Sequence, residues 1–130
     1  MLKVLVCGDI HISGKNPPER KDDLTIKQWR KIENIVFNAN FYEAPVICTG
    51  DVFQTPIVSN KIMSRLGEIL NKLHHPFYFV FGNHDLQYHN LDMLDQTSLG
   101  VMWLNNQMIK HISEFEKDYG TAWSYIDWRS

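Results

Sequence analysis

The sequence has few cysteines, no long apolar run and little net charge, and each shortage excludes a class of protein. Its two cysteines, Cys7 and Cys48, have no metal-binding spacing and lie in apolar segments, which predicts buried free thiols in a reducing compartment. No stretch is long enough to span a membrane, and the apolar start of the chain reaches an acid at Asp9, too early for a signal peptide. We therefore expect a cytoplasmic protein.

The charge and composition fit an ordinary globular domain. A formal net charge of −2 gives no general attraction to nucleic acid, so such binding would have to come from local basic patches or a metal ion. The hydrophobic content of 44% and the absence of internal repeats predict one domain over residues 1–130 with a real core.

The order of apolar segments predicts an α/β fold. Short apolar runs at Leu2–Cys7, Val46–Thr49 and Phe77–Phe81 are typical of buried strands. Apolar residues recur at helical spacing from Leu24 to Phe41, and a second helix begins at Ser59. Strands and helices that alternate in this way predict a parallel or mixed sheet flanked by helices.

The remaining segments give weaker patterns. Ile12–Asp23 contains glycine, two prolines and several charges and is predicted to be a surface loop. Leu91–Leu94 is predicted to be a short helix. Val101–Leu104 and Met108–Ile112 are predicted to be two strands joined at Asn105–Asn106.

All three predicted strands end in the same way, with a glycine followed by Asp9, Asp51 or Asn83. A single Gly-Asp pair after a strand is usually a turn, but parallel strands bring their carboxyl ends to one edge of the sheet. His11 follows Asp9 closely and can point to the same place. Carboxylates gathered at one edge repel one another, and a divalent cation removes that conflict. This oxygen-rich set with an imidazole suits Mn²⁺, Fe²⁺ or Zn²⁺.

The same residues carry a family resemblance. The motifs GDIH, TGDVF and GNHD begin at Gly8, Thr49 and Gly82, and in this order they resemble the calcineurin-like metallophosphoesterases. Within that superfamily, the sequence most resembles the SbcD-type nuclease subunit of double-strand-break repair complexes and its phage relatives. This resemblance implies a single domain over residues 1–130, partial or truncated, that forms the N-terminal half of a four-layer metallophosphoesterase sandwich.

The resemblance also implies roles for individual residues. Asp9 and His11 would bind a first metal ion, Asp51 would bridge two ions, and Asn83 would bind the second. The favoured ion would be manganese, with iron, zinc or magnesium as alternatives.

The reaction implied is hydrolysis of a phosphoester, with DNA as the substrate. His84 would protonate the leaving oxygen or stabilise the transition state, and Asp85 would hold its imidazole in position. Lys15 and Arg20, in the loop after His11, are candidates for contact with a phosphate backbone, although a solvated loop explains them equally well.

Two departures from the family pattern bear on activity. Gln54 stands where such nucleases commonly carry a histidine or an acid; it can orient a phosphate or a water molecule but cannot shuttle a proton. The family also completes its metal site with histidines in the second half of the domain, and only His89 and His111 follow Asp85 here, in unrelated contexts. The first ion therefore keeps three candidate ligands (Asp9, His11 and Asp51) and the second keeps two (Asp51 and Asn83), so we expect a two-ion site made from this chain alone to be incomplete.

Three functions remain open at this point. The first is a metal-dependent phosphoesterase, specifically a DNA nuclease subunit that works as a homodimer or with an ATPase subunit of a repair complex. The second is a truncated, catalytically impaired relative that acts by binding a nuclease complex or another partner. The third is a phosphatase or phosphodiesterase for small molecules.

Overall fold

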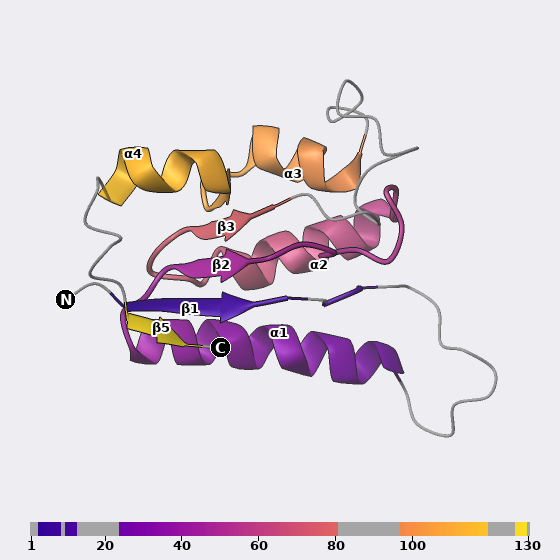
Figure 1. Ribbon diagram of the computed structural model, residues 1–130. Helices are drawn as coiled ribbons and strands as arrows, with labels where there is room; N and C mark the ends of the chain where they lie inside the picture. The colour runs from indigo at the N-terminus through magenta and orange to yellow at the C-terminus, as the bar shows by residue number, and fades with distance from the viewer. Residues whose placement is uncertain (1–2, 9, 13–23, 81–96, 120–126, 130) are drawn as a thin grey trace.

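A computed structural model describes residues 3–8, 10–12, 24–80, 97–119 and 127–129 of the chain (Figure 1). The described elements form one sheet with helices on its faces. This arrangement confirms the predicted α/β class. In the described part of the chain, no helix combines the length and the apolar character that crossing a membrane requires.

The sheet has five parallel strands in the order β4-β3-β2-β1-β5. They are β1 (Lys3–Cys7), β2 (Val46–Cys48), β3 (Phe77–Phe79), β4 (Ile109–His111) and β5 (Asp127–Arg129). The register aligns the carboxyl ends of the first four strands, because Cys7, Cys48, Phe79 and His111 form one row across the sheet. The strand ends therefore meet at one edge, as predicted for the three strands found in the sequence.

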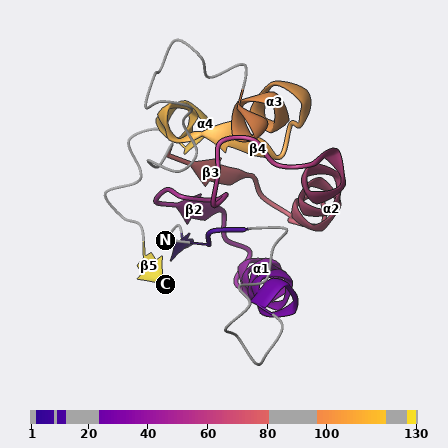
Figure 2. The same ribbon diagram turned by 90° about the vertical axis from the view of Figure 1, so that its right-hand side faces the viewer.

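The helices are divided unequally between the two faces of the sheet. They are α1 (Leu24–Phe41), α2 (Asn60–Leu70), α3 (Ser98–Asn105) and α4 (Phe115–Tyr119), which follows a short 3-10 helix, η3 (Ile112–Glu114). Figure 2 shows α1, α2 and α3 on one face and α4 on the other. The larger part of the core lies under the first three helices.

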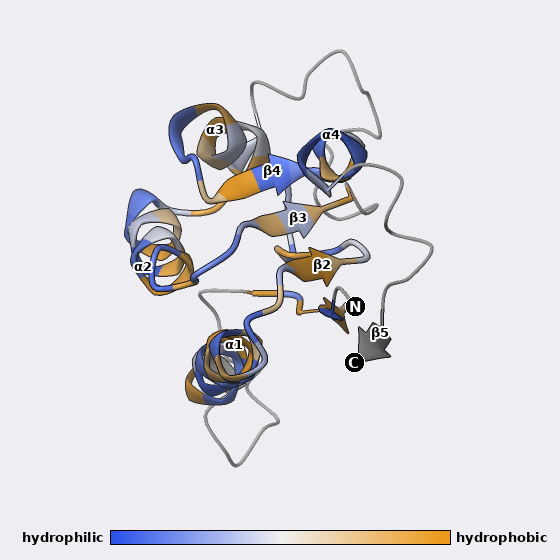
Figure 3. Cartoon of the chain, turned by 90° about the vertical axis from the view of Figure 1, so that its left-hand side faces the viewer, coloured by the Kyte–Doolittle hydropathy of each residue, from blue (hydrophilic) through white to orange (hydrophobic). Residues whose placement is uncertain are grey.

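The apolar strands are buried on both faces, which explains their continuous hydrophobic sequences. In β3, Phe77 and Phe79 pack in the core under α1, α2 and α3, whereas Tyr78 packs against Phe115 of α4. Figure 3 shows β2 and the start of β4 in hydrophobic colours, while the end of β4 is hydrophilic. Successive side chains of β3 thus point to opposite faces of the sheet and pack into two separate cores.

The two long helices form where the sequence predicts them. In α1, Trp29, Ile32 and Val36 are buried, but Ile26 and Phe37 of the same apolar series are exposed. Ser59 caps α2 by accepting a hydrogen bond from the backbone N–H of Ile62.

The prediction of a strand at Val101–Leu104 is wrong, because this segment lies inside α3. The hydroxyl of Thr97 accepts a hydrogen bond from the N–H of Gly100 and caps the helix. Leu99 and Met102 are buried and lie three residues apart, which is helical spacing. After α3 the chain turns at Asn106 into β4. The predicted strand at Met108–Ile112 is confirmed by β4, although its neighbour is β3 in a parallel pair and not the expected hairpin.

A polar network that is partly exposed to solvent joins α4 to the sheet. The hydroxyl of Tyr78 donates to Oδ2 of Asp118 at 2.6 Å, and Nζ of Lys110 donates to the same oxygen at 2.7 Å. Burial and the bond to Asp118 raise the pKa of Tyr78, and burial also raises the pKa of Tyr119.

This network predicts a loss of stability in alkali. An unfolded tyrosine ionises near pH 10 while folded Tyr78 keeps its proton, so its contribution to stability is complete below about pH 10 and declines above it by about 1.4 kcal/mol per pH unit. Urea denaturation of the wild type and of Tyr78→Phe between pH 8 and about pH 11.5 measures the effect. We expect the variant to lose stability less steeply with pH, since it lacks one of the groups whose pKa is raised in the folded protein, and parallel curves would contradict this origin.

Candidate functional site

The chains that leave β1 and β2 continue side by side beyond the ends of the strands. The N–H of His11 donates to the carbonyl of Asp51 and the N–H of Ile12 donates to that of Val52, both at 2.9 Å. Ile12 and Phe53 then form an isolated parallel bridge. His11 and Asp51, which are far apart in sequence, are thus neighbours at the carboxyl edge of the sheet.

Both of these residues have an unusual backbone conformation. The φ angle is 51° at His11 and 54° at Asp51, in the left-handed region that side chains other than glycine rarely adopt. Gly50, directly before Asp51, has a φ of 128° that only glycine adopts easily. Strained backbone of this kind tends to occur at sites where a side chain must point in one direction for function.

The floor of this edge is apolar and fully buried. Ile12, Val52 and Phe53 have no solvent-exposed surface. An added Cβ at Gly8 would collide with the hydroxyl oxygen of the exposed Thr49 side chain. Close packing below the edge therefore fixes the backbone from which His11 and Asp51 project.

Two cysteines lie beneath the edge, Cys48 fully buried and Cys7 partly buried. Both are free, as predicted, and Cys7 pairs in register with Cys48. Two causes raise the pKa of Cys7 well above its usual range: the larger is a hydrogen bond between the two thiols, and the smaller is burial. The Cys48 thiol also contacts the carbonyl oxygen of Gly50 at 3.7 Å, as a donor.

The structure brings two of the predicted metal ligands together, His11 and Asp51. The third strand runs to the same edge, since the N–H of Val80 donates to the carbonyl of Cys48. The other predicted site residues, in the metal, catalytic and phosphate-contact groups, lie outside the described residues: Asp9, Lys15, Arg20, Asn83, His84 and Asp85.

A single imidazole and a single carboxylate fit a divalent ion as part of a ligand set, not as the whole of it. Within the described ranges, no three histidine, cysteine or acidic side chains lie close enough to hold a metal ion. The His11 ring contributes a buried Nδ1 atom to the edge. These donor types suit a divalent metal ion in general, and a complete ligand set needs residues beyond these two.

Gln54 lies at the same edge, three residues after Asp51. Its N–H donates to the carbonyl of Ile12 at 2.9 Å, which extends the pairing of the two chains, and its side chain is exposed. This position is compatible with contact to a substrate.

His74, His75 and His111 are described away from the edge, where each has a polar contact of its own. His111 caps η3, because its Nδ1 accepts from the N–H of Ser113, and burial lowers its pKa. His74 and His75 lie beyond the end of α2 and both contact the carboxylate of Glu43, at 2.9 and 3.5 Å. His89, the other histidine that follows Asp85, lies outside the described residues.

A family model for calcineurin-like phosphoesterases matches residues 2–127. The chain belongs to the calcineurin-like phosphoesterase family. Phosphoesterases of this family generally bind divalent metal ions, and the parallel sheet with its flanking helices corresponds to half of the family's four-layer sandwich. None of the curated proteins matches the sequence.

The backbone of this phosphoesterase edge gives a prediction of its own. Gly50→Ala places a Cβ at a φ of 128° and should destabilise the fold by about 1–3 kcal/mol. Gly67→Ala is the matched control: it lies inside α2, where a Cβ would have ordinary contacts at 3.7 Å or more, so it should stabilise the fold by about 0.5–1 kcal/mol. Urea denaturation measures both, and equal effects would show that the conformation at Gly50 is not required.

Proposed function

We propose that this protein is a manganese-dependent phosphodiesterase that acts on DNA, as the nuclease subunit of a repair complex. The observation that carries the proposal is the pairing of His11 with Asp51, two residues with left-handed backbones joined by a main-chain hydrogen bond at the carboxyl edge of the sheet. An imidazole and a carboxylate projecting from a rigid edge are suited to hold a divalent ion.

The proposed ligand set follows the motifs of the family. His11 and Asp9 would hold a first ion, Asp51 would lie between two ions, and Asn83 would complete the second. The ions, when bound, would activate water and neutralise charge on the phosphoryl oxygens. His84 would hold a proton for the leaving oxygen, and Asp85 would orient its imidazole.

DNA is favoured over small phosphoesters by the resemblance of GDIH, TGDVF and GNHD to repair nucleases. The net charge of −2 means that attraction to the DNA backbone has to be local. Lys15 and Arg20 are the proposed phosphate contacts near the edge, and the exposed Gln54 is proposed to orient a phosphate or a water molecule.

The experiment is hydrolysis of single- and double-stranded DNA and of a small chromogenic phosphodiester by the purified chain, with Mn²⁺, Mg²⁺, Zn²⁺ or chelator. We expect cleavage of DNA that requires Mn²⁺. Cleavage of the small substrate alone would indicate a small-molecule phosphodiesterase. The absence of hydrolysis with every metal would contradict the proposed activity.

A second candidate function is a binding role in a nuclease complex, as a homodimer partner or beside an ATPase subunit. Gln54 favours it, because glutamine cannot transfer a proton at the position where repair nucleases commonly carry a histidine or an acid. Under this alternative the chain would bind Mn²⁺ or a nuclease partner without hydrolysing DNA.

A further inference from the structure

A glutamine from α1 reaches the edge of the sheet directly below His11. Gln28 is 91% buried, with a relative exposure of 9%, and its Nε2 donates to the backbone carbonyl of His11 at 2.5 Å. A carbonyl oxygen only accepts hydrogen bonds, so the amide nitrogen of Gln28 has to face it. Figure 1 shows α1 running alongside β1 and the short continuation of the chain beyond it.

With this bond, the peptide groups before and after His11 are both held by hydrogen bonds. Its own N–H is held by the carbonyl of Asp51, and the N–H of Ile12 is held by that of Val52. The carbonyl between them is held by Gln28. Because both peptide groups that flank His11 are fixed, its φ and ψ angles are fixed, and so is the direction in which its side chain leaves the backbone.

The cost of the arrangement suggests its purpose. A left-handed backbone at a residue other than glycine persists only when the surroundings impose it. A buried glutamine is also uncommon, since its amide loses contact with water and needs partners in the protein. Two costly features that meet at one carbonyl point to a requirement on the orientation of His11 and not to packing alone.

We propose that Gln28 is a positioning residue for metal binding: it holds His11 in its left-handed conformation, so that the imidazole faces the ion. This inference rests on the proposed function, because it takes His11 to be a metal ligand. It adds to the proposed metal site a residue of α1, a helix that none of the three motifs includes. Residues that orient a metal ligand typically change metal affinity by about 10- to 100-fold when they are replaced.

The decisive variant is Gln28→Met, which keeps the length of the side chain and removes the donor. Isothermal titration with Mn²⁺ should show a dissociation constant raised by about tenfold or more over the wild type. Gln28→Glu is a second variant: an ionised carboxylate cannot donate to the carbonyl of His11, so at a pH where this carboxyl group is ionised the variant should weaken Mn²⁺ binding at least as much.

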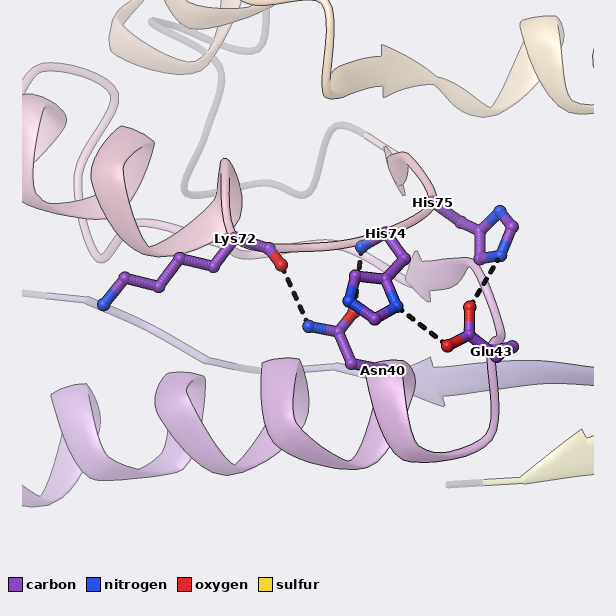
Figure 4. Close-up of polar contacts among 5 residues, drawn as sticks. All are labelled: Asn40, Glu43, Lys72, His74 and His75. Carbon is purple, nitrogen blue, oxygen red and sulfur yellow. Dashed lines mark hydrogen bonds and ion pairs between the residues drawn. The ribbon is translucent and has the colours of Figure 1, made fainter.

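Asn40 offers a matched control on the same helix. Its Nδ2 donates to the backbone carbonyl of Lys72 at 2.9 Å, and its Oδ1 accepts from the N–H of His74 (Figure 4). Like Gln28, it therefore donates a hydrogen bond from its side-chain amide to a backbone carbonyl, but at the opposite end of α1, away from the edge. Asn40→Leu should lower the unfolding midpoint but leave the Mn²⁺ dissociation constant within about twofold of the wild type.

The titrations separate the outcomes. Folded Gln28 variants that bind Mn²⁺ as tightly as Asn40→Leu would overturn the positioning role and leave the proposed function intact. A wild-type chain that binds no Mn²⁺ would overturn the proposed metal site, and the positioning role with it. Weaker binding by both Gln28 variants but not by Asn40→Leu is the result we expect.

Discussion

Asp51→Asn is expected to reduce metal-dependent hydrolysis by about 10³-fold or more in kcat/KM, equivalent to about 4 kcal/mol of transition-state stabilisation. The substitution removes a charge and one oxygen donor while keeping the size of the side chain. Asparagine adopts the left-handed region at least as readily as aspartate, so the backbone at a φ of 54° should be retained. The measurement is the initial rate of hydrolysis with saturating Mn²⁺.

A second acidic residue with a left-handed backbone provides the control. Glu43 has a φ of 52° and lies before β2, at the opposite end of that strand from Asp51. Glu43→Gln removes the same charge in the same backbone conformation, but it should leave hydrolysis unchanged. Comparable losses of activity in the two variants would indicate a general charge effect and would contradict a specific role for Asp51.

The stability of the metal-free chain distinguishes chemistry from folding. Asp51 is partly exposed, so Asp51→Asn should change the free energy of unfolding by less than about 0.5 kcal/mol without metal. Asp51→Ala should cost more, because alanine disfavours the left-handed region. A variant that is inactive but as stable as the wild type would assign the loss to the carboxylate.

Much of the fold could be predicted because buried parallel strands and amphipathic helices give strong patterns. The apolar runs around Cys7, Cys48 and Phe79 have the length of strands and end at glycine or beside it. The error at Val101–Leu104 has a physical origin: four apolar residues in a row suit a buried strand and a buried helix equally. Only the cap at Thr97 and the burial of Leu99 decide for the helix.

The edge that carries the candidate site could also be predicted, since parallel strands have to bring their carboxyl ends together. The left-handed backbones of His11 and Asp51 could not, because both conformations depend on hydrogen bonds between segments distant in sequence. Gln28 did leave a signal. It lies four residues before Ile32 on the buried side of α1, and a lone polar residue on such a stripe indicates a buried partner.

Phe53→Ala is expected to destabilise the protein by about 3–5 kcal/mol, a large share of the 5–15 kcal/mol typical of a domain. Phe53 is completely buried, and it pairs with Ile12 directly beneath the edge formed by His11 and Asp51. Removal of the ring leaves a cavity in the floor that anchors both residues. Urea denaturation measures the loss.

The control for Phe53→Ala lies in the same connection between β2 and α2. Ile57 is 60% exposed, so Ile57→Ala should cost less than about 0.5 kcal/mol. If the floor also positions the edge, folded Phe53→Ala should bind Mn²⁺ more weakly than Ile57→Ala at a temperature where both are native. Loss of stability with unchanged Mn²⁺ affinity would instead mean that two bonds hold the edge without the ring beneath it: the main-chain bond between His11 and Asp51, and the bond from the Gln28 side chain to His11.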